Sequence, residues 1–595
     1  MVSKRIRIGL LFVLAMVINL ALGLALSFFL FIREYQGQAL HHFADYLTSL
    51  SFLPTLLWGA GGGVGKAIHQ VYMMPLPQLI FWGLIVLAAL KVWLSDGMGY
   101  KEAHKDGSHG TARLQTRGEI RKHYQKDQIG YILGESNRHI AVQSIRNVLN
   151  LNPHALVFGG SGSAKTAGYV IPNILHIAET LGESQVILDP KGELWNRTSA
   201  RLKELGYEVI AFNLLDDKKK RSARWNPMSG LKKDGEVLTP AAVELATVIY
   251  ESTSSEREDR FFSASGKDLL TALILYVLEA RPEREHHLRN VLHLCATIGK
   301  DQEALRGMFE ELPERSQARA FFDSADTSAE KQWEGIRGDV KSRLGLWNME
   351  EIADLTAASD FDPADLGRKK MALYLMIPDS DNTYNLIPAL LIAQAFKMLI
   401  QQADLNRNAK LEVPVWFLLD ELGNLPRIKE LDAKVNTVRS REIRMMMIFQ
   451  NIPQFQDKYG KEGSKSIDAS CDTTIFLGTK ESTTNKIFSE MVGETTIMIP
   501  SYSDNGQSKS GKNESYTGRP VMKLDEVRMI RKTNEVLVFQ PGRHTARLKK
   551  CLYFKKDRWK DLPATHWQEI PKRKYEPLAL CEVPKPKLPD DYMPE

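Results

Sequence analysis

Residues 155–166 read Ala-Leu-Val-Phe-Gly-Gly-Ser-Gly-Ser-Ala-Lys-Thr, a short apolar run followed by a glycine-rich loop that ends in Lys-Thr. An apolar run of this length, bounded by turn-forming residues, is typical of a buried strand. The residues that follow, 167–171, suit the start of a helix. A strand, a glycine loop and a helix start in this order are the context that a phosphate-binding loop requires. The stretch therefore predicts an α/β fold built around a nucleotide site.

Each part of this loop has a chemical task. Glycines let backbone N–H groups turn inward around phosphate oxygens, and the helix start adds its dipole to the anion site. We expect the lysine to reach the β- and γ-phosphates of ATP, and the threonine hydroxyl to hold Mg²⁺. The predicted nucleotide-binding residues are Gly159, Gly160, Ser161, Gly162, Ser163, Ala164, Lys165 and Thr166. For the loop taken alone, the alternative is an ordinary Gly/Ser turn with a chance lysine.

Ala164 departs from the motif, which has glycine immediately before the lysine. A methyl group fits there with little strain if the backbone at this position is already nearly helical. On that expectation, the departure bears more on the rate of hydrolysis than on nucleotide binding.

A second motif lies about 250 residues later in the chain. Residues 413–419 are apolar and strand-like, and Asp420 and Glu421 stand at their end. We expect Asp420 to contribute to the Mg²⁺ shell and Glu421 to orient or deprotonate the attacking water. Strands that merely stop at acidic residues are common, but the pairing with the earlier loop favours ATP hydrolysis.

A third apolar strand, residues 443–449, ends at Gln450. In RecA-like motors a polar residue at the end of the strand beside the acidic motif senses the γ-phosphate, and Gln450 is our candidate; a glutamine that caps a loop is the alternative. Arg439, Arg441 and Arg444 lie around the start of this strand. One of them is expected to reach the γ-phosphate of a neighbouring subunit, with Arg441 as the candidate, and simple solvation is the alternative for each.

The composition is that of a globular protein of more than one domain. The chain has 595 residues, 43% of them hydrophobic and 25% charged. Its net charge of +6 is too small to indicate nucleic-acid binding by bulk charge, so any basic surface is local. The four cysteines have neither metal-ligand spacing nor the density of a disulfide framework, which favours a reducing compartment.

Two apolar stretches near the start predict a membrane anchor. Residues 8–32 contain no charge, and residues 76–94 contain only Lys91, so each is long enough to cross a bilayer as a helix. The flanks outside the pair are more basic than the loop between them, which places both termini in the cytoplasm. The alternative, a cleaved signal peptide, has a shorter apolar run and would export the nucleotide site away from ATP. We therefore expect a multi-pass membrane protein with its nucleotide site in the cytoplasm.

The middle of the chain reads as helical. Pairs of apolar residues recur at three- and four-residue spacing across residues 261–278, a helical period. This pattern predicts an all-α domain inserted between the two halves of the nucleotide-binding domain. The expected organisation is an anchor (1–96), a first nucleotide-binding part (97–234), an all-α domain (235–355), a second nucleotide-binding part (356–575) and a tail (576–595).

A basic stretch near the end, residues 547–560, contains interleaved Tyr553, Phe554 and Trp559. Basic residues mixed with aromatic ones are typical of surfaces that bind single-stranded nucleic acid. A solvated edge strand is the alternative, and it is the interpretation we favour.

Several further stretches, in the order in which they occur, resemble the type IV coupling protein family, the ATPases of bacterial conjugation. The stretches that carry the resemblance are His109–Arg113, Asp189–Leu194, Trp225–Pro227, Leu419–Pro426, Arg439–Gln450, Gly518–Pro520 and Leu524–Val527. The last two look like the closing strands of the family's motor. The resemblance spans roughly residues 105–560, and the ordered set is more specific than any one piece.

The resemblance implies a RecA-like P-loop NTPase with a mostly parallel sheet, which uses ATP and Mg²⁺. It also implies a homo-hexamer at the bacterial cytoplasmic (inner) membrane, with its motor in the cytoplasm. In that family the motor recruits a relaxase-bound single strand of DNA and passes it to the channel subunits of a type IV secretion system. Three alternatives stay open at this point. They are a coupling protein for protein effectors, a nucleotide-gated receptor or scaffold with little hydrolysis, which Ala164 favours, and a chromosome-pumping translocase.

Overall fold

The computed structural model describes residues 12–19, 21, 25, 79–87, 101–102, 107–146, 151–253, 260–379, 381–428, 430–503 and 511–582. The chain forms two compact units, one of residues 1–102 with 498–515 and the other of residues 103–497 with 516–595. A three-stranded sheet has the order β1 (Lys101–Glu102), β13 (Glu494–Ser503) and β14 (Gly511–Pro520). All predicted site residues belong to the larger unit.

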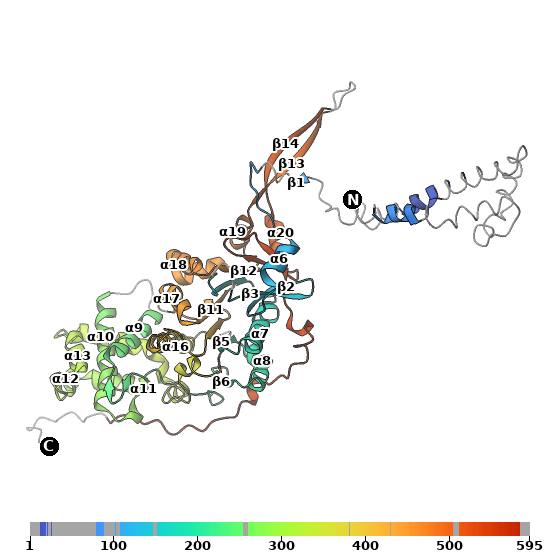
Figure 1. Cartoon of the computed structure of the whole chain (residues 1–595). Helices are drawn as coiled ribbons and strands as arrows, with labels where there is room; N and C mark the ends of the chain where they lie inside the picture. Colours follow the sequence, from blue (N-terminus) through green and yellow to red (C-terminus); the bar gives the residue numbers. More distant parts are fainter. Residues whose placement is uncertain are drawn as a thin grey trace, which may run out of the picture. The chain divides into compact units, whose positions relative to one another are not determined.

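A large sheet organises the larger unit (Figure 1). Its strands are β2 (Gly130–Ser136), β3 (His139–Ser144), β4 (Ala155–Gly159), β5 (Ser184–Pro190), β6 (Glu208–Asn213), β9 (Met371–Ile377), β10 (Val415–Leu419), β11 (Ile443–Phe449), β12 (Thr473–Gly478), β15 (Glu535–Phe539) and β16 (Ala546–Lys549). Their spatial order is β3-β2-β16-β15-β12-β4-β11-β10-β5-β9-β6. Neighbours from β12 to β6 pair in parallel, and the remaining pairs are antiparallel. The predicted α/β fold with a mostly parallel sheet is confirmed.

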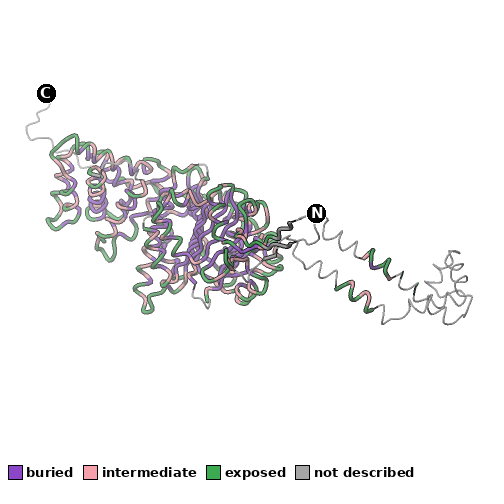
Figure 2. Tube along the Cα trace, turned by 90° about the horizontal axis from the view of Figure 1, so that it is seen from above, coloured by how far each residue is buried: buried purple, intermediate pink, exposed green. Residues whose placement is uncertain are grey.

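Both faces of the sheet are covered by helices. Successive side chains of a strand point to opposite faces, so each strand contributes to the hydrophobic cluster on either side. In β4, Leu156 and Phe158 join one hydrophobic cluster, and Ala155 and Val157 join the other. One face packs against α7 (Ile171–Thr180) and α8 (Glu193–Glu204), and the other against α16 (Leu386–Leu405), α18 (Ile452–Ala469) and α19 (Ser482–Val492). Figure 2 shows the buried residues concentrated in the interior of the larger unit. This burial explains why the strands read as continuous apolar runs.

A group of helices lies between β6 and β9 in the chain. Its α-helices are α9 (Thr239–Thr253), α10 (Arg260–Ala280), α11 (Leu288–Thr297), α12 (Gln302–Glu310), α13 (Gln317–Ala325), α14 (Glu330–Arg343) and α15 (Glu350–Leu355). α10 contacts α9, α11, α13 and α14 and is the centre of the group. Its apolar pairs, such as Leu269–Leu270 and Leu273–Ile274, are fully buried. The helices gather beside one end of the sheet (Figure 1).

Among the described residues, two helices, α10 and α16, are long and apolar enough to cross a membrane. Their most apolar windows are 61% and 67% buried inside the protein, so both are core helices. The predicted spans, residues 8–32 and 76–94, lie mostly outside the described residues. The described parts of these spans, 12–19 and 79–87, are helical and expose large apolar side chains. The membrane anchor stays a prediction.

The expectation of a closing strand at Leu524–Val527 is wrong. These residues begin the helix α20 (Leu524–Met529). The carboxylate of Glu526 accepts a hydrogen bond from the backbone N–H of Lys523 at 2.7 Å and so satisfies a donor at the start of the helix. This local cap favours a helical turn over an extended segment.

The expectation of a solvated edge strand near the C-terminus is also wrong, because β16 lies between β15 and β2. Among the aromatic residues that follow, Phe554 is exposed, but Trp559 is not available for stacking. Trp559 is buried and donates from its indole N–H to Glu179 at 3.1 Å, and the guanidinium of Arg558 lies 3.8 Å from its ring centroid. Lys556 is ion-paired with Glu135. Several basic residues of this stretch, among them Arg547, Lys556 and Lys560, therefore have intramolecular partners.

The described part of the predicted tail, residues 576–582, packs on the helical group. The side-chain amide of Asn290 donates to the carbonyl oxygen of Ala579 at 3.0 Å, and its oxygen accepts from the backbone N–H of Cys581 at 3.0 Å. Cys581 is buried. This stretch is thus attached to α11, and residues 583–595 lie outside the described part of the chain.

Candidate nucleotide-binding site

The glycine loop connects β4 to the helical turn η1 (Thr166–Val170), which continues into α7. Gly162 and Ala164 have left-handed backbone angles, φ +73° and +59°, whereas Lys165 has φ −50°. Alternation of left- and right-handed residues turns successive N–H groups into one concave surface, which is an anion site. The N–H of Gly160 donates to the carbonyl oxygen of Gly478 in β12 at 2.9 Å and anchors the loop. The loop therefore has the backbone form of a phosphate cradle.

Ala164 is not nearly helical, so the condition under which a methyl group fits without strain is not met. Its φ of +59° places it in the left-handed region, where the Cβ of an L-residue approaches the following carbonyl oxygen. This costs roughly 1–2 kcal/mol for a residue other than glycine. The left-handed conformation explains why the motif has glycine at this position. This chain has a strained alanine there instead.

The structure brings Lys165 together with both carboxylates of the second motif. The Nζ atom of Lys165 lies 3.3 Å from Oε1 of Glu421 and 3.9 Å from Oδ1 of Asp420. The side chain of Lys165 is only 7% exposed. β4 and β10 both run parallel to β11, which lies between them, so their carboxyl ends meet at one edge of the sheet. Ligands of open α/β sheets bind at this edge.

Gln450 lies at the same edge, because it directly follows β11. Its backbone N–H donates to the side-chain oxygen of Gln454 at 3.0 Å, which fixes the end of the strand. The position between the glycine loop and the acidic motif is the one a γ-phosphate sensor requires. The sensing role itself stays a prediction.

Asp420 fits a bound cation. Burial raises the pKa of Asp420 to about 6; the charge of Lys165 opposes this rise and that of Glu421 adds to it. Within the described part of the chain, Oδ1 of Asp420 is buried and has no hydrogen-bond donor. A buried carboxylate oxygen without a donor is costly unless a cation satisfies it. The residues present, Asp420 with the hydroxyl of Thr166 at the start of η1, therefore suit Mg²⁺.

The arginine candidates lie at the opposite end of the strands from the nucleotide site. Arg441 precedes β11 and Gln450 follows it, and a strand of seven residues spans roughly 20 Å. Arg441 contacts Asp404, with Nε 2.7 Å from Oδ1. The guanidinium of Arg444 is buried and ion-paired with Glu183 and Glu442, so it supports the sheet. Arg441 can therefore act on a nucleotide only if that nucleotide belongs to another subunit.

The Asp-Pro-Lys-Gly-Glu stretch builds the turn between β5 and α8. The carboxylate of Asp189 accepts hydrogen bonds from the backbone N–H groups of Leu194 and Trp195 at 3.1 and 2.7 Å. Gly192 has φ +75°, and a Cβ there would lie 2.7 Å from the ring of Trp567. Lys191 reaches toward solvent and pairs with Asp379 at 2.9 Å. The stretch thus caps α8 and forms a close-packed turn. It also places the ammonium group of Lys191 at the edge of the sheet where the candidate nucleotide site lies.

Sequence reasoning missed Arg531, which contacts the glycine loop from the turn between α20 and β15. Its Nε and Nη2 atoms donate to the carbonyl oxygen of Ser161 at 3.0 and 2.6 Å. The turn is itself held, because the buried ammonium of Lys550 donates to the carbonyl oxygens of Ile530 and Thr533 at 3.3 and 3.2 Å. Arg531 lies 370 residues from Ser161 in the chain, and no motif marks it.

Ala164→Gly should stabilise the protein, because glycine adopts the left-handed conformation without strain and Ala164 is exposed and loses no packing. We expect a gain on the order of 1 kcal/mol, visible as a higher midpoint in thermal unfolding of the nucleotide-free protein. Ala167→Gly, in η1, is the matched control and should lower the midpoint because glycine weakens helices. Equal shifts for both variants would contradict the strain.

Arg531→Ala should weaken nucleotide binding, because the glycine loop loses the two hydrogen bonds to the carbonyl oxygen of Ser161. The dissociation constant for ATP should rise by about three- to tenfold, as measured by titration calorimetry. Arg531→Lys, with one donor left in reach, should fall between. Arg528→Ala, on the exposed side of α20, should bind as the unmodified protein does, and a similar loss there would show a general effect on the segment.

Mg²⁺-dependent nucleotide binding should weaken as the pH falls through about 6, because protonation removes the charge of Asp420 that attracts the cation. Titrations with and without EDTA at a series of pH values isolate the Mg²⁺-dependent part. In Asp420→Asn this part should be small at every pH. A constant Mg²⁺ effect across the range in the unmodified protein would exclude Asp420 as the metal-binding group.

Comparison with known proteins places this site in a family context. A model of the type IV secretory system conjugative DNA transfer family matches residues 110–574. The chain is 25% identical over 496 residues to protein VirD4 of Rhizobium rhizogenes, which covers 81% of this chain and 71% of the relative. It is 25% identical over 416 residues to the conjugal transfer protein TraG of Rhizobium radiobacter, covering 68% of this chain and 62% of the relative.

The fold is also found in solved structures. The plasmid coupling protein TrwB in complex with ADP and Mg²⁺ is 17% identical with a TM-score of 0.57, covering 79% of this chain and 99% of that chain. TrwB in complex with a non-hydrolysable ATP analogue is 17% identical with a TM-score of 0.56, covering 74% and 93%. At these identities the similarity shows a shared fold. The family match spans most of the chain, and the protein therefore belongs to the type IV secretory system conjugative DNA transfer family, the coupling proteins.

Proposed function

We propose that this protein is a membrane-anchored, ATP-hydrolysing motor that couples relaxase-bound single-stranded DNA to a type IV secretion channel and drives its transfer. The observation that carries the proposal is the meeting of Lys165 with Asp420 and Glu421 at one edge of the sheet, beside Gln450. A loop, a lysine and two carboxylates in this arrangement are what phosphoryl transfer to water requires. Membership of the family supports DNA as the cargo.

In the proposed mechanism, backbone N–H groups of the glycine loop hold the phosphates, apart from those of Gly160 and Ser163, which donate to carbonyl oxygens of the protein. The Nζ atom of Lys165 turns from Glu421 to the β- and γ-phosphates, which frees Oε1 of Glu421. Glu421 then orients the attacking water and accepts its proton. A bound Mg²⁺, held by Thr166 and Asp420, would neutralise charge that develops on the phosphate oxygens. Gln450 senses whether the γ-phosphate is present.

We further propose that the motor works as a homo-hexamer at the bacterial cytoplasmic membrane. Arg441 lies at the opposite edge of the sheet from its own nucleotide site, so a role in catalysis requires a neighbouring subunit. The apolar stretches 8–32 and 76–94 are the proposed membrane anchor, and through them the motor meets the channel subunits. The fold shared with TrwB, whose structures contain ADP with Mg²⁺ or an ATP analogue, supports the nucleotide part of this proposal.

Two alternatives have observations in their favour. The strained conformation of Ala164 favours a nucleotide-gated receptor or scaffold with little hydrolysis. The names of the relatives cover both conjugal transfer and type IV secretion coupling, as in the VirD4 protein of Bartonella quintana, so protein effectors are an alternative cargo. The intact Lys165, Asp420 and Glu421 favour the motor over the scaffold.

The proposal predicts ATP hydrolysis by the full-length protein in detergent that single-stranded DNA stimulates. Lys165→Ala should abolish binding and turnover. Glu421→Gln should retain ATP binding and lower turnover by about a hundredfold or more, because it removes the general base. Measurement of phosphate release with and without DNA checks these outcomes. Tight ATP binding by the unmodified protein without turnover under either condition would favour the scaffold.

A further inference from the structure

Both carboxylate oxygens of Glu421 are engaged. Oε1 faces the ammonium of Lys165 at 3.3 Å, and Oε2 accepts a hydrogen bond from the side-chain amide of Asn424 at 3.0 Å. Asn424 reaches back because the chain turns tightly after β10, through η6 (Leu422–Asn424). The backbone N–H of Asn424 donates to the carbonyl oxygen of Glu421 at 2.9 Å, and Glu421 itself has a left-handed φ of +53°. The turn therefore fixes the amide against the carboxylate.

Asn424 is held in turn by a second asparagine. The side-chain amide of Asn385 donates to the carbonyl oxygen of Asn424 at 2.9 Å and to the side-chain oxygen of Asn382 at 2.9 Å. Asn385 is 1% exposed and stands immediately before α16. A buried amide with two acceptors in place has little freedom to rotate. Asn385 therefore attaches the turn of Glu421 to the start of α16.

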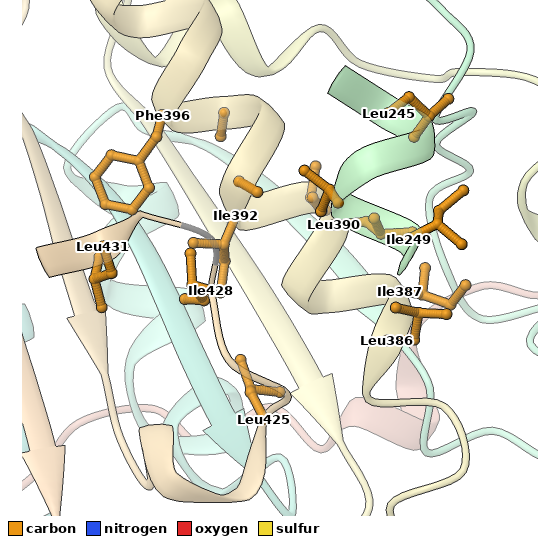
Figure 3. Close-up of a cluster of buried hydrophobic side chains, with 14 of the residues drawn as sticks. Leu245, Ile249, Leu386, Ile387, Leu390, Ile392, Phe396, Leu425, Ile428 and Leu431 are labelled. Atoms are coloured by element: carbon orange, nitrogen blue, oxygen red, sulfur yellow. The ribbon is translucent and has the colours of Figure 1, made fainter. Parts of the chain in front are cut away.

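The residues after Asn424 strengthen this attachment. Leu425, Ile428 and Leu431 are fully buried and face α16 in the cluster drawn in Figure 3. On its other side, the start of α16 faces Leu245 and Ile249 of α9, in the helical group (Figure 3). The loop beyond the acidic motif is thus packed as a core segment, and its position follows that of α16.

We propose that Asn424 positions Glu421 for its reaction with water, and that Asn385 keeps Asn424 in place. This inference rests on the proposed function. When Lys165 turns to the phosphates, Oε1 is free for the water, while Oε2 stays bound to Asn424. The hydrogen bond to Oε2 then fixes the plane of the carboxylate and with it the direction in which Oε1 faces the water. A freely rotating carboxylate would have no such fixed direction.

Steady-state kinetics of the full-length protein test this role. In Asn424→Ala, kcat should fall by about tenfold with KM for ATP unchanged, because the lost hydrogen bond orients the base and does not touch the nucleotide. Asn385→Ala should shift kcat in the same direction by less. Asn406→Ala is the matched control, since its amide donates to the carbonyl oxygen of Lys410 at 2.7 Å beyond the other end of α16. It should leave both constants unchanged.

The isosteric variant Asn424→Asp gives a readout that a structural role would not move. A second carboxylate beside Oε2 repels the charge of Glu421, so the pair retains a proton to higher pH. The acidic limb of the kcat–pH profile should therefore move upward by about one unit or more. In Asn424→Ala the limb should move much less, because no like charge is introduced.

Carbodiimide labelling reports the same protonation without turnover, because the reagent modifies protonated carboxyl groups. Labelling of Glu421, quantified by peptide mass spectrometry over a pH series, should persist to higher pH in Asn424→Asp than in the unmodified protein. An unchanged labelling midpoint in this variant, or a rise in KM with constant kcat in Asn424→Ala, would overturn the inference. Absence of turnover in the unmodified protein would count against the motor alone, since labelling still decides whether Asn424 faces Glu421.

Discussion

Lys165 is buried against Asp420 and Glu421, and this cluster can form only if the ends of β4 and β10 meet at one edge of the sheet. A buried ammonium is costly without carboxylate partners, and two adjacent carboxylates repel without a cation. The side chains of the site are thus a set of charges that satisfy one another incompletely. The raised pKa of Asp420 and its oxygen without a donor record that incompleteness. A nucleotide with its cation is the ligand that would complete the set.

The glycine loop depends on support from outside its own sequence. Its backbone turns N–H groups inward, so its carbonyl oxygens point outward and need donors. Arg531 supplies the donor for Ser161, and the N–H of Gly160 is fixed by Gly478. A Cβ on Gly478 would collide with the backbone of Arg531, so the two supports pack against each other. Strain at Ala164 is tolerated because these contacts over-determine the loop.

The sheet also connects the site to the helical group. α16 covers one face of the sheet, its first turn is next to Asn385, and α9 packs on it. A displacement of α9 would therefore first move α16, the helix that holds the turn of Glu421. Interiors are close-packed, so such a displacement is transmitted and not absorbed locally. This arrangement gives a physical route between the helical group and Glu421, the proposed general base.

Local patterns were enough to predict the strands that end at the glycine loop, at Asp420 and at Gln450, and with them a mostly parallel sheet. Each of these strands is buried on both faces and reads as an apolar run, and each site residue directly follows its strand. The strand expected at Leu524 was wrong and the conformation of Ala164 was not readable from the sequence, because capping bonds and backbone angles are set by neighbours that the pattern does not show.

The sequence by itself determined the residue types of the candidate nucleotide site, since a lysine, two carboxylates and a glycine loop are readable in it as motifs. Only the tertiary structure decided which residues support them. Arg531 meets Ser161 across 370 positions, and Asn385 meets Asn424 across 39. Ordinary arginines and asparagines carry no signal in the chain, because their roles arise from contacts that exist only after the strands have paired. For the same reason, only the folded structure shows that Arg444 pairs with Glu183 and that Trp559 donates to Glu179. With these buried partners, neither residue is available for a role at the surface.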